Sequence, residues 1–387
     1  MRKSVLSGIV LICILLCGCN VKPQSKGIES KVYGVWVSCF ELDKMLISGN
    51  FKNDFSSAVE GCVNLGITDV FIHTRPFCDS IYKSEYFPLR ASAENVDFDV
   101  LEYIVNICHK NNIRVHAWIN PYRVKTDSTD TGALANDSPV RAWLEDSEPS
   151  NDTNVVLLNG VYLNPASLEA TKLVLDGIRE IINNYDIDGV HFDDYFYPTE
   201  SEEFDKVLYQ KYVEQTQNPL SLFDWRRQNV NAFISQVNSL IEYKNDDIIF
   251  SISPAASVDK NYNSLYADIP LWIENEYIDW IMPQLYFGFN YPESEFQFDE
   301  LYDKWQNQTE NKNVKLIIGL ANYKIDNEDF EEREEWSSGN LIKRQMEYIN
   351  NSSNGCCFFS LTSLLGDTPN QTSERENIKA WMTYNKN

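Results

Sequence analysis

Residues 188–198 have the sequence DGVHFDDYFYP, and two adjacent aspartates, Asp193 and Asp194, stand inside this stretch. Its valine, histidine and aromatic residues are typical of a β-strand. The two carboxylates are not, because a charge buried in a strand is costly unless it is paired. The stretch therefore predicts a strand over 189–196 that delivers functional groups near its end.

Short apolar runs rich in β-branched residues recur along the chain, and each ends in polar or aromatic residues. Together with the first stretch they make eight strand candidates, at 32–39, 69–76, 114–121, 189–196, 248–255, 279–286, 315–322 and 355–362. Near-continuous apolar runs fit strands that are buried on both faces, as in a parallel sheet.

Helical patterns lie between most of these strands. Apolar residues three and four apart predict helices within 54–66, 98–112, 167–185, 223–243 and 340–351. Ser167 is a suitable N-cap and Gly66 a suitable helix end. Alternating strands and helices predict an α/β fold, a single-domain (β/α)8 TIM barrel over residues 31–387. An open doubly wound sheet is the alternative, but no GxGxxG sequence follows a strand.

The composition limits the possible partners. The chain has 33 lysine and arginine residues against 57 aspartate and glutamate residues, for a formal net charge of −24. This charge argues against nucleic acid, because phosphate binding needs a basic face. The hydrophobic content of 43% supports a real core, and the aromatic content of 13% suits a large core or a sugar-stacking surface. No cofactor is predicted.

The N-terminal segment has the pattern of an export signal. In residues 1–18 the basic MRK precedes the apolar run SVLSGIVLICILL, which is typical of a signal peptide. The LCGC that follows resembles the bacterial lipobox, in which the last cysteine, here Cys19, is lipidated. Residues 19–30 then predict a polar tether. We expect an extracytoplasmic protein anchored to the membrane by lipid on Cys19, with an ordinary cleaved signal as the alternative.

Six cysteines belong to the predicted barrel, and none has the CxxC or Cys/His spacing of a metal site. Several stand inside apolar runs, so buried free thiols are expected rather than a disulfide framework. They are Cys39, Cys62, Cys78, Cys108, Cys356 and Cys357.

In a (β/α)8 barrel the chemistry lies at the C-terminal ends of the strands, so the residues that close each run matter most. These are Glu41, His73, Arg75, His116, Trp118, Asn120, His191, Asp193, Asp194, Ser253, Gln284, Tyr286 and Asn322. Strand alternation lets His73 share a face with Arg75. A lone inward histidine or terminal arginine is more often a structural residue, but the convergence of so many polar groups favours a site.

Convergent carboxylates, amides and aromatic rings are what a glycan site needs. One carboxylic acid protonates the leaving oxygen, and a second stabilises or attacks the anomeric carbon or activates water. Asp193 is the first candidate for a catalytic role, and Asp194 would pair with it, orient the substrate or supply acid/base function. Candidates for sugar stacking, or equally for core packing, are Trp36, Trp118, Tyr122, Tyr195, Tyr197 and Tyr286.

Six long segments, in order along the chain, resemble the glycosyl-hydrolase-like 10 family of bacterial exported proteins: GVWVSCFELDK, FIHTRPFCDSIYKSEYFP, VHAWINPYRV, YLNPASLEATKLVLDGIREII, DIDGVHFDDYFYP and IDWIMPQLY. The resemblance runs from about residue 31 to the last strand. It implies a (β/α)8 barrel, a glycoside hydrolase, and a bacterial cell-wall or extracellular glycan as substrate, with peptidoglycan glycan strands the leading candidate. It carries the catalytic assignment to Asp193 and Asp194.

Two wider similarities concern the same stretch. DGVHFDD is similar to the fourth-strand motif of α-amylase-type barrels, where Asp193 would align with the nucleophile. It also resembles the fourth strand of chitinases, but Tyr195 stands at the position of their acid glutamate, so a plain chitinase mechanism is doubtful. In a regular strand Asp193 and Asp194 would point to opposite faces. Asp194 could face Asp193 only if the strand ends at Asp193 and the chain turns there, as Pro198 indicates it must do soon. Glu41 and Asp79 are therefore further candidates for the second carboxylate.

The sequence thus predicts a lipid-anchored glycoside hydrolase. Side chains expected to bind sugar hydroxyl or acetamido groups are Arg75, His116, Asn120, Asn164, His191, Gln284 and Tyr286, with Trp118 as a stacking contact. A metal-dependent hydrolase that uses His73, His116, His191 and Asp193 is a first rival, although no HxH pair ends the first strand. A non-catalytic glycan-binding lipoprotein is a second rival, since the second carboxylate is not evident.

The lipid anchor is directly testable. Replacing Cys19 by Ser removes the thiol that would carry the lipid, so the variant should move from the membrane fraction to the soluble fraction on cell fractionation. If the variant stays in the membrane fraction as the parent does, the lipid is ruled out.

Overall fold

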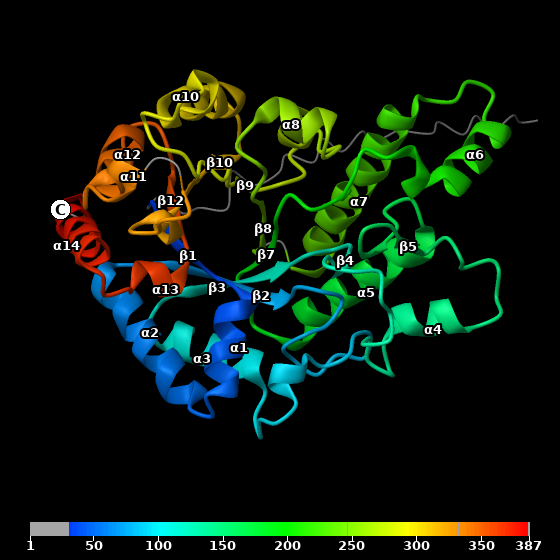
Figure 1. Cartoon of the computed structure of the whole chain (residues 1–387), viewed down its shortest axis with the longest axis horizontal. Helices are drawn as coiled ribbons and strands as arrows, with labels where there is room; N and C mark the ends of the chain where they lie inside the picture. The colour runs from blue at the N-terminus through cyan, green and yellow to red at the C-terminus, as the bar shows by residue number, and fades with distance from the viewer. Residues whose placement is uncertain (1–30, 246, 331–332, 386–387) are drawn as a thin grey trace, which may run out of the picture.

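The computed structural model describes residues 31–245, 247–330 and 333–385. The predicted signal peptide, the tether and Cys19 lie outside these residues. Figure 1 shows parallel strands at the centre of the described part, with helices packed around them. The architecture confirms the predicted (β/α)8 barrel. No helix in the described part of the chain is long and apolar enough to cross a membrane.

Each of the eight predicted strands is present, and the seventh is divided in two at Ile317. The barrel strands are β1 (Val32–Val37), β2 (Asp69–Arg75), β3 (Arg114–Ile119), β7 (Gly189–Phe192), β8 (Ile249–Ile252), β9 (Trp280–Ile281), β10 (Lys315–Leu316), β11 (Ile318–Leu320) and β12 (Gly355–Phe359). Every neighbouring pair is parallel, in the order β10-β9-β8-β7-β3-β2-β1-β12-β11. Because β10 and β11 are pieces of one strand, their pairing with β9 and β12 closes the barrel.

The helices of the outer layer include the five that were predicted and others that were not. They are α1 (Cys39–Ile47), α2 (Phe51–Leu65), α3 (Val100–Lys110), α5 (Leu168–Asn184), α6 (Lys206–Gln215), α7 (Leu222–Lys244), α8 (Val258–Asn263), α9 (Ile269–Glu274), α10 (Phe298–Thr309), α11 (Arg333–Trp336), α12 (Leu341–Ile349), α13 (Leu361–Leu364) and α14 (Pro369–Asn385). Ser167 caps α5 by accepting a hydrogen bond from the Ala170 N–H, and Gly66 ends α2 with a left-handed φ of 82°. Both predicted helix boundaries are confirmed.

The connection from β3 to α5 is long and carries a small domain-like insertion. It contains α4 (Pro139–Glu145) and an antiparallel sheet of β4 (Arg123–Lys125), β5 (Val155–Leu157) and β6 (Val161–Leu163), in the order β4-β6-β5. Because this segment follows β3, it leaves the barrel at the C-terminal ends of the strands (Figure 1). The insertion therefore extends the face on which barrel chemistry is expected.

The N-terminal end of the barrel is closed by an ionic cluster. The Asp69 carboxylate accepts hydrogen bonds from His116 Nε2 at 2.8 Å and from Arg114 Nε and Nη2 at 2.8 Å each. Burial alone would raise the pKa of Asp69, but these bonds outweigh it and lower that pKa. A Cβ on Gly189 would lie 2.1 Å from His116 Nδ1, so the first residue of β7 must be glycine. His116 is fully buried in this floor, which corrects the expectation that it binds sugar.

The cysteine prediction is confirmed within the described residues. All six barrel cysteines are buried and free. Burial raises the pKa of the Cys62 and Cys78 thiols to about 12, so these thiols stay protonated and unreactive at neutral pH.

Candidate active site

The end of β7 places the two aspartates. The last residue of the strand is Phe192, whose carbonyl oxygen accepts a hydrogen bond from the Ser253 N–H at 2.8 Å. The chain then turns, because the Tyr195 N–H donates to Asp193 Oδ1 at 3.3 Å. Strict strand alternation therefore does not apply to Asp193 and Asp194, because the strand ends before them and the chain turns there. Both carboxyl groups lie at the C-terminal end of the barrel.

The two carboxyl groups interact strongly with each other. Asp193 is only 4% exposed and Asp194 is partly buried. Burial, and after it the charge of Asp194, raises the pKa of Asp193 to about 8. Burial also raises the pKa of Asp194, while hydrogen bonding and the positive charges of Lys260 and Arg123 oppose that rise. Two carboxyls in this environment do not both ionise near neutral pH, so the pair holds one proton there.

Neighbouring strands orient Asp193. The indole N–H of Trp118 is shared between Asn120 Oδ1, at 3.2 Å, and the Asp193 carboxylate. The Trp118 ring stacks on His73 with 3.7 Å between ring centroids, and burial lowers the pKa of His73 well below its ordinary value. The Asn120 Nδ2 group is buried and has no hydrogen-bond partner among the described residues. The Asn120 side chain also contacts His73, so Asn120 helps to orient the Trp118 and His73 rings beside Asp193.

Gln284 and Tyr286 lie on the Asp194 side of the site. Gln284 donates from Nε2 to the Ser253 carbonyl at 2.9 Å, and its side chain hydrogen-bonds the Asp194 carboxylate. The Tyr286 ring stacks on Phe359 with 5.8 Å between centroids, and it lies close enough to Asp194 for that charge to raise its pKa. The structure therefore brings Trp118, Asn120, Gln284 and Tyr286 together around the aspartates, as the strand-end reasoning expected.

His191 lies one layer below the aspartates, inside the barrel. Trp36 Nε1 donates to His191 Nε2 at 3.0 Å, so Nε2 is an acceptor and the proton is on Nδ1, which contacts Ser251 Oγ at 2.8 Å. Burial lowers the pKa of His191 well below its ordinary value, which keeps the ring neutral. The ring is fully buried. The structure thus corrects the expected sugar contact of His191 to support from beneath.

Arg75 also departs from the prediction. A register shift between β2 and β3 occurs between His73 and Arg75, and this bulge turns Arg75 away from the face of His73. Its guanidinium lies 4.0 Å from the centre of the Phe87 ring, and a Cβ on Gly177 of α5 would lie 2.1 Å from its Nη1. Arg75 is therefore buried between the barrel and α5 and does not reach the site.

Asn164 stabilises a turn. Its side-chain oxygen accepts from the Ala166 N–H at 3.0 Å, and its own N–H donates to the Asn154 carbonyl at 2.9 Å. Tyr122 and Tyr197, two of the predicted stacking residues, are 1% exposed and pack on Phe233 and Phe204. These rings belong to the core, whereas Tyr195 is 43% exposed.

The two other candidates for the second carboxylate are occupied. Glu41 Oε2 accepts from the N–H and Oγ of Ser38 at 2.8 Å each, while Oε1 accepts from Ser360 Oγ and the Thr362 N–H at 2.7 Å each. This capping box fixes the start of α1 to the end of β12. Asp79 pairs with Arg90 at 2.6 Å. These contacts favour Asp194 as the partner of Asp193.

Four residues at the rim of the site form a chain that we call the rim cluster, namely Phe40, Phe77, Arg123 and Tyr195. The Arg123 guanidinium lies 3.6 Å from the centre of the Tyr195 ring and 5.8 Å from that of Phe77, and Phe77 contacts Phe40 with 6.5 Å between centroids. Sequence reasoning missed all but Tyr195. The available signal was that each follows one of the first four barrel strands by a few residues.

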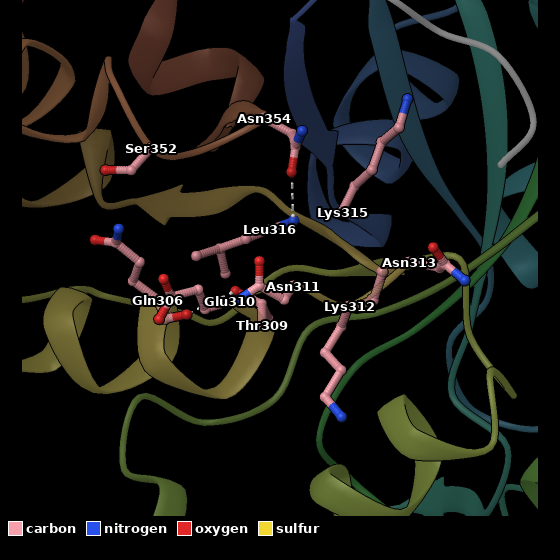
Figure 2. A pocket seen from close by; sticks show the side chains of 11 residues that line it. Gln306, Thr309, Glu310, Asn311, Lys312, Asn313, Lys315, Leu316, Ser352 and Asn354 are labelled. Carbon is pink, nitrogen blue, oxygen red and sulfur yellow. Dashed lines mark hydrogen bonds between the residues drawn. The ribbon is translucent and has the colours of Figure 1, made fainter.

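The described residues also offer no metal-binding cluster, and a polar hollow elsewhere lies away from the aspartates. Among the described residues, no group of three or more His, Cys, Asp or Glu side chains is arranged to hold a metal ion. A polar hollow of about 380 Å³ is lined by Asn311, Lys312, Lys315, Leu316 and Asn354 among others (Figure 2). Because these residues precede or begin β10 and β12, this hollow lies at the end of the barrel opposite the aspartates.

Comparisons with known proteins find relatives that are named glycosyl hydrolases. Residues 31–338 match the family model described as glycosyl hydrolase-like 10. "Glycosyl hydrolase YngK" of Bacillus subtilis (strain 168) is 32% identical, over 87% of this chain and 69% of its own length. "Glycosyl hydrolase DigH" of Escherichia coli (strain K12) is 27% identical, over 82% of each chain.

Solved structures with the same fold have far lower sequence identity. The glycoside hydrolase domain of PgaB (BpsB) from Bordetella bronchiseptica aligns with a TM-score of 0.57 and 10% identity, over 90% of this chain and 99% of that one. The catalytic domain of β-amylase from Paenibacillus polymyxa aligns with a TM-score of 0.60 and 10% identity, over 90% and 98%. These likenesses concern the fold alone, and they support the barrel assignment.

The raised pKa of the pair predicts that removing one carboxyl stabilises the fold at high pH. The folded-state pKa of Asp193 is raised, so its contribution to stability is fully present below the ordinary carboxyl pKa of about 4. That contribution is lost as the pH rises toward about 8. Asp193→Asn should therefore have a higher Tm than the parent, by a few degrees at pH 8 and by less at pH 5.

Asp137→Asn is the matched control, since Asp137 is exposed and should change Tm little at either pH. Thermal unfolding followed by circular dichroism measures the difference. A Tm gap between Asp193→Asn and the parent that does not widen from pH 5 to pH 8 would contradict the raised pKa.

Proposed function

This chain belongs to the glycosyl-hydrolase-like 10 family, and we propose that it hydrolyses O-glycosidic bonds in a bacterial cell-wall or extracellular glycan, with peptidoglycan glycan strands as the leading candidate. The observation that carries the proposal is the pair of buried, interacting carboxyl groups at the C-terminal end of β7. Such pairs, whose environment separates the roles of acid and base, are the chemical requirement for glycoside hydrolysis.

We assign the proton of the pair to Asp193. Because burial and the neighbouring charge raise the pKa of Asp193, this carboxyl is suited to donate a proton to the leaving oxygen near neutral pH. Asp194 is then the carboxylate that stabilises the developing positive charge, attacks the anomeric carbon or activates water. Asn120 and Gln284 would hold polar groups of the sugar, and Trp118 and Tyr286 would form apolar walls beside it.

The proposed site of action follows from the N-terminal sequence. A signal peptide over residues 1–18 and a lipidated Cys19 would hold the enzyme outside the cytoplasmic membrane, where cell-wall glycans are found. The tether over residues 19–30 would let the barrel reach a substrate some distance from the membrane surface.

Activity of carboxyl variants tests the catalytic assignment. Asp193→Asn retains the shape and the hydrogen bond from the Tyr195 N–H but cannot donate the required proton. We expect turnover of purified peptidoglycan to fall at least about a hundredfold. The assay measures the release of soluble fragments with new reducing ends. Near-parental turnover by Asp193→Asn would remove Asp193 from the reaction.

A matched pair of variants tests the identity of the second carboxylate. Asp194→Asn should lower turnover about as much as Asp193→Asn, whereas Glu41→Gln should lower it less, because Glu41 is engaged in the capping box. Thermal unfolding of each variant separates loss of fold from loss of chemistry. A larger loss in folded Glu41→Gln than in Asp194→Asn would transfer the role to Glu41.

A further inference from the structure

The rim cluster combines exposed rings with a cation beside the catalytic pair. Phe40 is 63% exposed and Tyr195 is 43% exposed, while Phe77 and Arg123 are partly buried. The four residues follow β1, β2, β3 and β7, which are neighbours in the barrel. Exposed aromatic rings in a row are costly to solvate, and they provide flat faces on which sugar rings stack.

Like Arg75, which is buried against Phe87, Arg123 differs from the ion-paired arginines around the barrel. Arg90 pairs with Asp43 and Asp79, Arg114 with Asp69, and Arg226 with Asp205. In the described part of the chain no carboxylate forms an ion pair with Arg123, whose guanidinium instead covers one face of the Tyr195 ring. The charge of Arg123 acts on Asp193 and Asp194 only at longer range. Arg123 also hydrogen-bonds the Tyr195 side chain, and its remaining donors are available to a ligand.

A cation at this position would offset the negative charge of an acidic protein where a ligand binds. The formal net charge of −24 repels anionic polymers, although salt screens that repulsion beyond about 10 Å. A substrate that carries carboxylates therefore needs a local positive group at the site. Arginine suits this role because its planar guanidinium binds a carboxylate through two parallel hydrogen bonds.

We infer that the rim cluster is a subsite for a sugar that carries a carboxylate, with Arg123 binding the carboxylate and Tyr195 and Phe77 contacting the sugar ring. The inference rests on the proposed function and narrows its substrate to an acidic glycan. A carboxylate of this kind comes from the lactyl ether of muramic acid in peptidoglycan or from a uronic acid in other polysaccharides. The rim cluster would place this sugar next to the bond that the aspartates cleave.

Monosaccharide binding tests the subsite without any hydrolysis, because a monosaccharide contains no glycosidic bond. Dissociation constants for the parent protein would be measured by NMR titration with two matched pairs of ligands. N-acetylmuramic acid is compared with N-acetylglucosamine, and glucuronic acid with glucose. We expect at least one acidic sugar to bind about tenfold more tightly than its neutral match, as a charge-assisted hydrogen bond provides.

Variants assign the preference to Arg123. Arg123→Gln should remove the preference for the acidic sugar, and Arg123→Lys should retain part of it, because lysine keeps the charge but not the planar donors. Lys125→Gln is the matched control, since Lys125 lies two residues along the same strand and donates to the Asp130 carbonyl at 3.1 Å. It should bind both sugars as the parent does.

The outcomes separate the inference from the proposed function. Equal binding of acidic and neutral sugars by the parent, or an unchanged preference in folded Arg123→Gln, would overturn the subsite. Tighter binding of N-acetylmuramic acid than of glucuronic acid supports both the subsite and a peptidoglycan substrate. The reverse order supports the subsite and overturns peptidoglycan as the substrate. If the parent protein binds the acidic sugar more tightly but shows no turnover, the proposed enzymatic activity is contradicted and the subsite is not.

Discussion

The candidate site depends on the burial of two adjacent carboxyl groups immediately after a strand ends. Ionised carboxylates on adjacent buried residues repel each other, so one of them keeps a proton. The chain can hold Asp193 and Asp194 there because β7 stops at Phe192, and the Tyr195 N–H then binds Asp193. The arrangement costs stability as the pH rises from about 4 toward 8, and in return it places a proton donor beside a carboxylate.

The interior of the barrel below the aspartates is organised to hold them in place. Its floor is the Asp69 cluster with His116, and Gly189 leaves the space that this histidine occupies. Above it the neutral His191 binds Trp36 and Ser251, and the Trp118 indole forms the next contact up, to Asp193. Polar groups thus follow one another from the floor to the mouth. Each is held by hydrogen bonds to its neighbours, which fixes the rotamers of the catalytic groups.

The alternation of strands and helices predicted the barrel, the cap residues Ser167 and Gly66 predicted two helix ends, and the polar end of the fourth strand predicted the position of Asp193. Strand periodicity could not predict where a strand departs locally from regular geometry. A bulge turned Arg75 outward. The sequence left open whether the strand would continue through Asp194, and in the structure β7 ends at Phe192. The sequence pattern also could not predict how deep a side chain lies in the barrel. His116 and His191 face the interior as expected, but both are fully buried below the aspartates. Arg123 was overlooked because its lack of a carboxylate partner is a property of the folded chain.

The central claim is that glycan chemistry occurs at Asp193 and Asp194. A crystal structure of Asp193→Asn with a bound oligosaccharide fragment of the substrate tests it most directly, because this variant should bind without cleaving. The account predicts a glycosidic oxygen within hydrogen-bond distance of residue 193, about 2.6–3.2 Å, with the adjoining sugar against Tyr195. An oligosaccharide bound at the opposite end of the barrel, in the hollow lined by Lys312 and Asn354, would contradict it.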